Sequence, residues 1–154
     1  MKHLIFQTNN TWTGTLLRWT VGIVFIPHGL QKTLGLFGGM GWDGTMKFFT
    51  ENLQLPYMVA STVILVEFLG SISLLLGWAT RFWALSFIGL LIGIMFSSHL
   101  DNGFFMNWLG TQKGEGCQFD ILAIGIVVTL LMEGGGKLSV DRWILTKYIL
   151  KKEL

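Results

Sequence analysis

An apolar run near the N-terminus, residues 16–36, is long enough to cross a lipid bilayer. It nevertheless contains Arg18, Pro27, His28, Gln31 and Lys32. A charged side chain near the centre of a membrane helix costs about 2.5–3.5 kcal/mol on insertion scales, so a simple anchor would not carry them. At helical spacing, one stripe of the run consists of Arg18, Gly22, Phe25, Gly29 and Lys32. We expect this stripe to face other helices rather than lipid.

The composition of the chain points to a membrane protein. Only 13% of its 154 residues are charged and 51% are hydrophobic, which is about half the charge of a soluble domain. This length fits a single domain over residues 1–154. A net charge of +2, without a basic run among aromatics, excludes a nucleic-acid-binding protein. Cys117 is the single cysteine, which excludes an intramolecular disulfide and a CxxC redox centre.

Apolar segments of helical length recur along the chain and predict an all-α fold, an integral membrane four-helix bundle. We expect its transmembrane helices over about residues 13–34, 57–78, 82–100 and 118–134. Because the link at residues 79–81 is short, the second and third helices must be antiparallel neighbours.

Two further segments do not fit a transmembrane helix. Residues 35–56 are too polar and rich in glycine to cross, so we expect an interfacial segment after the first helix. A short helix over residues 44–53, capped by Asp43, would lay Met46 and Phe48 on the membrane surface. The basic C-terminal tail alternates apolar and charged residues, which predicts an amphipathic helix along an anionic membrane surface.

The basic residues predict the orientation. With four crossings, the two termini and the Arg81 link share a side, and that side holds eight of the eleven Lys and Arg residues. Basic residues favour the cytoplasmic face, so we expect both termini in the cytoplasm of a multi-pass protein. The two long aromatic connections would then face outward.

Polar residues converge at the outward ends of the predicted helices, and we expect them to form a pocket there. The set comprises His28, Gln31, Lys32, Ser98, His99, Gln118 and Asp120, with Glu67 deeper and Arg18 contributing to the electrostatics. Ionisable residues inside a membrane commonly mark a functional site. The alternative is that these groups pair to hold the bundle together, with Glu67 neutral or bonded to Arg18 or Lys32.

The residue types in this pocket favour proton exchange. Histidine is the residue type best suited to exchange protons near neutral pH, so His28 and His99, with Glu67, are the candidate catalytic residues. Two histidines without a further motif are weak evidence for haem, and we do not expect one. No metal-ligand spacing surrounds Cys117, and the glycines at 35–41 match neither GxGxxG nor a P-loop, so no cofactor is evident. Twelve Phe and seven Trp could form the flat apolar slot that a quinone needs.

Four motifs occur in order over nearly the whole chain. They are R-x3-G-x6-G-x2-K (Arg18, Gly22, Gly29, Lys32), E-x2-G with G-x2-TR (Glu67, Gly70, Gly77, Thr80, Arg81), H-x3-GFF (His99, Gly103, Phe104, Phe105) and G-x-G-x-L-S-x-D (Gly134, Gly136, Leu138, Ser139, Asp141). Together they resemble the DoxX family. The resemblance implies a four-helix protein of the bacterial cytoplasmic (inner) membrane, linked to quinone-dependent redox systems. Relatives often carry a Glu near the position of Gln118. Here Asp120 would take the role of that carboxylate.

Three functions are compatible with these features. The leading hypothesis is a DoxX-like membrane subunit of a quinone-linked oxidoreductase system that binds quinone in the outward polar pocket. The alternative is a non-catalytic scaffold that recruits a soluble redox or detoxification enzyme to the membrane. A small transporter is less favoured, since the sequence shows no inverted repeat. Expected partners are therefore the bilayer, a quinone, and a soluble redox enzyme or a second membrane subunit.

Overall fold

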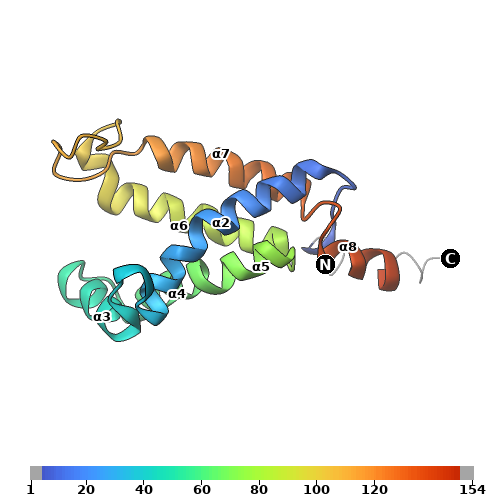
Figure 1. Ribbon diagram of the computed structural model, residues 1–154, viewed down its shortest axis with the longest axis horizontal. Helices are drawn as coiled ribbons and strands as arrows, with labels where there is room; N and C mark the ends of the chain where they lie inside the picture. The colour runs from blue at the N-terminus through green and yellow to red at the C-terminus, as the bar shows by residue number, and fades with distance from the viewer. Residues whose placement is uncertain (1–4, 150–154) are drawn as a thin grey trace.

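The computed structural model describes residues 5–149, which fold into long, roughly antiparallel helices with no strand among them (Figure 1). The long segments are α2 (Trp12–Leu34), α4 (Tyr57–Leu65) continuing through η3 (Val66–Gly70) into α5 (Ser71–Leu76), α6 (Thr80–Ile94) continuing through η4 (Met95–His99) and η5 (Leu100–Asn102), and α7 (Gln118–Glu133). The predicted all-α fold is confirmed, and these helices end within two residues of the apolar segments of the sequence.

Glycine and proline set the helix ends. Gly35 follows α2 with a left-handed φ of 70°, a conformation that glycine adopts without steric cost. Pro56 precedes α4, where its missing N–H costs no helical hydrogen bond. Gly77, with a φ of 70°, ends α5, and the short turn to α6 makes these two helices antiparallel neighbours, as predicted. Pro27 lies inside α2, which continues through it.

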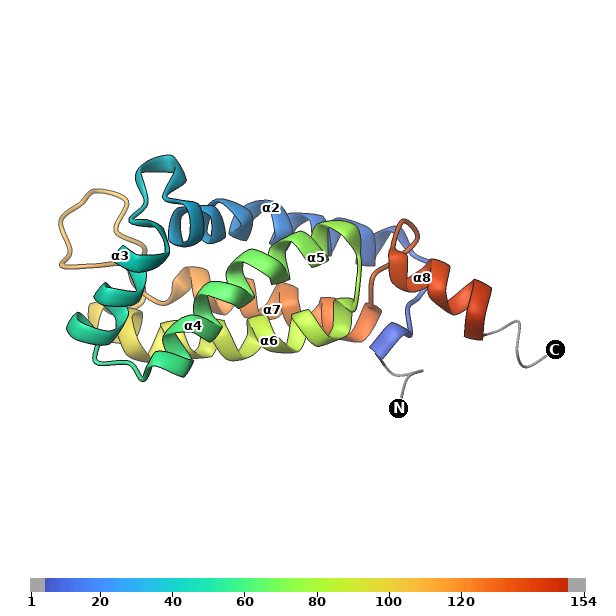
Figure 2. The same cartoon turned by 90° about the horizontal axis from the view of Figure 1, so that it is seen from below.

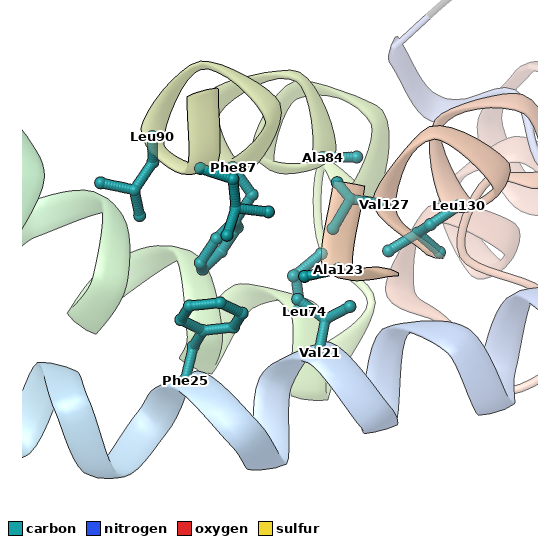
Figure 3. Packing of buried hydrophobic residues seen from close by; sticks show 10 residues of the cluster. Val21, Phe25, Leu74, Ala84, Phe87, Leu90, Ala123, Val127 and Leu130 are labelled. Atoms are coloured by element: carbon teal, nitrogen blue, oxygen red, sulfur yellow. The ribbon is translucent and has the colours of Figure 1, made fainter. Parts of the chain in front are cut away.

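Side chains from α2, α5, α6 and α7 meet in one apolar core (Figure 3). Phe25 of α2 packs against Phe87 of α6, with their ring centres 5.0 Å apart. Leu74 of α5 and Val127 of α7 are fully buried beside them. This core holds the middle of the bundle together and leaves the polar residues toward the two ends.

The two ends of the bundle differ in construction (Figures 1 and 2). We call the end with α3 (Gly41–Lys47), η2 (Phe48–Asn52) and the 103–117 connection the loop end. We call the opposite end, where α2 starts and α8 (Val140–Ile144) lies, the tail end. The η6 turn (Leu145–Ile149) continues α8, so the predicted tail is helical as far as Ile149, and its residues 150–154 lie outside the described residues.

The helix of the first connection differs from its prediction. It starts at Gly41, three residues before the predicted residue 44, and Asp43 lies in its first turn instead of capping it. Met46 is buried against Ala60 and Ile64 of α4, whereas we expected it on a membrane surface. The small side chain of Ala60 leaves room for the methionine. Phe48, in contrast, is exposed.

Among residues 5–149, two helical segments are long and apolar enough to cross a membrane by length and composition: Tyr57–Leu76 and Thr80–Asn102. α7 has only 16 residues, and α2 carries Arg18 and Lys32 within its 23. The measured lengths and compositions therefore identify two of the four predicted spans as candidates.

Candidate functional site: two buried pairs beside an aromatic cluster

Arg18 lies at the tail end, where it is 1% exposed and bonded entirely to backbone. Its Nε donates to the carbonyl of Gly135 at 2.8 Å, and Nη1 donates to that of Leu74 at 3.0 Å. Further hydrogen bonds reach the carbonyls of Leu75 and Leu138. The planar guanidinium offers five N–H donors, so it can join α2, the end of α5 and the segment before α8. The expectation that Arg18 shapes the outward pocket is therefore corrected.

Asp141 completes this tail-end junction. Its carboxylate accepts hydrogen bonds from the backbone N–H groups of Ala79 at 2.6 Å and Thr80 at 2.8 Å, which satisfies free donors at the start of α6. Ser139 accepts from the N–H of Arg142 and caps α8. Burial raises the pKa of Asp141 above its ordinary value, while its hydrogen bonds and the nearby Arg18 charge limit the rise. The junction ties the tail to the bundle.

Glu67, half-way along the second long helix, pairs with Lys32 of α2. The Glu67 side chain is 3% exposed and that of Lys32 22%. A Cβ on Gly29 would lie 2.6 Å from Cα of Phe68, so only glycine permits this close approach of the two backbones. Glu67 lies in the π-helical turn η3, and such wide turns are frequent at functional sites. Of the partners considered for Glu67 in a purely structural role, the structure therefore shows Lys32.

His99 and Asp120 form a second pair between η4 and α7. His99 Nδ1 lies 2.6 Å from Asp120 Oδ2. The Asp120 side chain is 2% exposed and that of His99 24%, so the imidazole lies between the buried carboxylate and the surface. η4 is also a π-helical turn, and it ends at His99. Each buried pair thus has one member in a widened turn.

An aromatic cluster joins three helices. Phe25 of α2 contacts Phe119 of α7, with ring centres 6.4 Å apart, and His28, one turn further along α2, at 6.1 Å. Its contact with Phe87 of α6 completes the set (Figure 3). His28 and Phe119 are both exposed, and Phe119 directly precedes Asp120. The cluster therefore has one exposed phenyl ring, that of Phe119, one sequence position before the buried carboxylate.

The remaining predicted site residues lie outside these contacts. Gln31 donates its side-chain N–H to the carbonyl of Phe37 at 3.2 Å, in the first connection. Ser98 and Gln118 are exposed, and the Ser98 hydroxyl lies 3.2 Å from that of Ser97. The polar contacts therefore form two pairs on different helices, with His28 next to the aromatic cluster.

Sequence reasoning did not single out Phe87 and Phe119, and it placed Phe25 on a helix-packing stripe without assigning it a ring partner. Aromatic residues are too frequent in this chain, with 12 Phe, for one of them to stand out by type. Position next to Asp120 was the available signal for Phe119. Within residues 5–149, no group of three His, Cys, Asp or Glu side chains could hold a metal ion.

Comparison with known proteins gives the family. The sequence pattern of DoxX proteins matches residues 14–100. A protein of Bacillus subtilis (strain 168) named "Putative oxidoreductase CatD" is 31% identical over 129 residues, which cover 84% of each chain. No solved structure gives a significant match. On the strength of the pattern and of this relative, the chain belongs to the DoxX family, a family of membrane proteins.

Proposed function

We propose that this protein is a four-helix membrane subunit of a quinone-linked oxidoreductase system, with the tail end in the bacterial cytoplasm. Exposed tryptophans at the tail end support its position at a membrane interface: Trp12 begins α2, Trp78 lies in the turn before α6, and Trp143 lies in α8. Tryptophan favours the membrane interface. The ammonium of Lys137 lies 5.4 Å from the ring centre of Trp12, so basic and aromatic groups occur together there.

The charge pattern supports the orientation. At the loop end Lys32 pairs with Glu67, and Lys47 lies 4.0 Å from Glu51. Paired lysines add little net positive charge to that end. With the tail end cytoplasmic, α8 would lie along the anionic inner leaflet, where each basic residue contributes about 1 kcal/mol to surface attraction.

Cysteine labelling tests this topology. Lys137→Cys at the tail end and Thr111→Cys at the loop end, each in a Cys117→Ser background, are treated in intact cells with a membrane-impermeant maleimide. Both positions are exposed. We expect Thr111→Cys to react at once and Lys137→Cys only after permeabilisation. The opposite pattern would reverse the orientation, and labelling of both in intact cells would contradict four crossings.

The observation that carries the quinone proposal is the exposed ring of Phe119, which directly precedes Asp120 of the buried histidine–carboxylate pair in the sequence. A quinone needs a flat apolar contact and a group that exchanges hydrogen bonds or protons with its oxygens. Phe119, which is 37% exposed, offers the first, and His99 or His28 the second. The relative's name contains the word oxidoreductase, which agrees with this chemistry. Glu67 and Lys32 would set the charge of the loop end, and Arg18 has no part in the site.

Binding of a short-chain ubiquinone and of menadione to the purified protein in detergent tests the proposal. Phe119→Ala should weaken binding about tenfold, since an aromatic contact contributes about 0.5–1.5 kcal/mol beyond its buried area. His99→Gln and Glu67→Gln should also weaken it. Leu122→Ala, which removes an exposed side chain of the same helix, is the control. Unchanged binding in both His99→Gln and Glu67→Gln, with the fold intact, would refute the proposal.

One observation favours the scaffold as a second candidate. Trp108 and Leu109, at the tip of the 103–117 connection, are 83% and 86% exposed. The loop is fixed by its own hydrogen bonds: Asn107 donates to the carbonyl of Gln112 and accepts from its N–H. Gentle extraction from native membranes separates the two functions. A co-purifying enzyme without quinone would favour the scaffold, and a quinone with an enzyme would favour the redox subunit.

A further inference from the structure

We infer that Asp120 fixes the tautomer of His99 so that the site prefers the reduced quinol, which carries hydroxyl groups, over the quinone. This inference rests on the proposed function, since it specifies the ligand form for the same site.

The contact with Asp120 determines which ring nitrogen of His99 carries the proton. With Asp120 as the ionised partner, which can only accept hydrogen bonds, the 2.6 Å contact requires the proton on His99 Nδ1. In the neutral imidazole the other nitrogen, Nε2, then carries a lone pair and acts as an acceptor. Asp120 is a positioning residue in this arrangement, because it acts through His99.

Of the two paired side chains, His99 is the one that a ligand can reach from the surface. The Asp120 side chain is 2% exposed, whereas that of His99 is 24% exposed. A ligand therefore meets the imidazole and not the carboxylate. Phe119, the neighbour of Asp120 in the sequence, is 37% exposed and offers an apolar ring on the same helix.

The oxidised and reduced forms of the ligand differ in the hydrogen bonds that they can make. A quinone oxygen is an acceptor and faces the Nε2 lone pair unfavourably, whereas a quinol hydroxyl donates to it. One hydrogen bond that is made with one form and lost with the other corresponds to about a tenfold difference in affinity. A fixed acceptor thus selects the reduced form of the same ring system.

The test compares three ligands under anaerobic conditions: menadione, its quinol, and the dimethyl ether of that quinol, which has the ring but no hydroxyl donor. We expect the wild-type protein to bind the quinol about tenfold more tightly than either other ligand. In Asp120→Asn, the amide at position 120 can either accept a hydrogen bond from Nδ1 or donate one to it. The ratio of quinol to quinone affinity should therefore fall to near unity. His99→Phe should abolish the preference while keeping the ring contact.

A spectroscopic measurement reports the tautomer directly. Nitrogen NMR of protein labelled at histidine should show a protonated Nδ1 and an unprotonated Nε2 for His99, and Asp120→Asn should change that signature. The protein has three histidines, and His28→Gln assigns the His28 signal. A merely structural pair would alter stability in Asp120→Asn without changing the ratio of quinol to quinone affinity.

The outcomes distinguish this inference from the function on which it rests. If quinone and quinol bind equally well, or if Asp120→Asn keeps the wild-type ratio, the quinone site stands and the inference is overturned. A protonated Nε2 in the wild type overturns it too. If none of the three ligands binds a folded protein, the proposed function fails, and the inference fails with it.

Discussion

Replacing Arg18 with methionine should strongly destabilise the bundle. The guanidinium is 1% exposed and bonds the carbonyls of four residues. An unsatisfied buried carbonyl costs about 1–3 kcal/mol, so losing several at once should cost at least about 3 kcal/mol. Arg18→Lys should recover little, because an ammonium lacks the planar fork of donors. Thermal unfolding in detergent, followed by size-exclusion recovery, measures the effect.

Lys47→Ala is the matched control for this loss of a cation. Lys47 has a 72% exposed side chain and an i,i+4 partner in Glu51, and such exposed pairs contribute little. Its removal should leave the melting temperature close to that of the wild type. An Arg18→Met protein that melts within a degree or two of the wild type would show that the tail-end junction does not depend on the guanidinium.

The Lys32–Glu67 pair should show strong coupling in a double-mutant cycle. Lys32→Met strands a carboxylate whose side chain is 3% exposed, and such an unpaired buried charge costs about 3–5 kcal/mol. Glu67→Met strands the ammonium, which is 22% exposed and can reach polar surroundings, so its cost should be smaller. The double variant Lys32→Met/Glu67→Met should be more stable than Lys32→Met alone. Unfolding in mixed micelles titrated with SDS gives the four free energies.

The same cycle separates the structural from the functional interpretation of the pair. A double variant with restored stability and wild-type quinone binding would make the pair structural. Restored stability with lost binding would assign it to the site. If the losses of unfolding free energy in the two single variants simply add in the double variant, the two side chains do not interact, contrary to the geometry.

The sequence predicted the helices well because apolar length and terminal glycines or prolines act locally. It foresaw a Lys32–Glu67 pair only as one of several alternatives, since helical phase alone does not say which cation reaches Glu67. The partners of Arg18 could not be predicted, because every residue has a carbonyl and no side-chain type marks an acceptor. His99 and Asp120 are separated by 21 positions, and the loop between their helices leaves the register open.

The motifs that carried the family resemblance mainly describe construction. Arg18, Gly77 and Asp141 meet at the tail-end junction, where a Cβ on Gly77 would lie 3.1 Å from the Arg18 guanidinium carbon. Gly29 permits the close approach of α2 to η3. His99 belongs to the proposed site, and its partner Asp120 lies outside the four motifs. Recognising the family from these residues therefore identifies the fold more firmly than the chemistry.

The tail-end junction also governs the order in which the protein can be assembled. The side chain of Arg18 belongs to the first long helix to be synthesised, but two of its acceptors, Gly135 and Leu138, follow 117 and 120 residues later. Until those residues leave the ribosome, the guanidinium cannot complete its hydrogen bonds. During that time the guanidinium on the first helix lacks part of its hydrogen bonds. Completion of the tail-end junction is thereby coupled to the synthesis of Gly135 and Leu138.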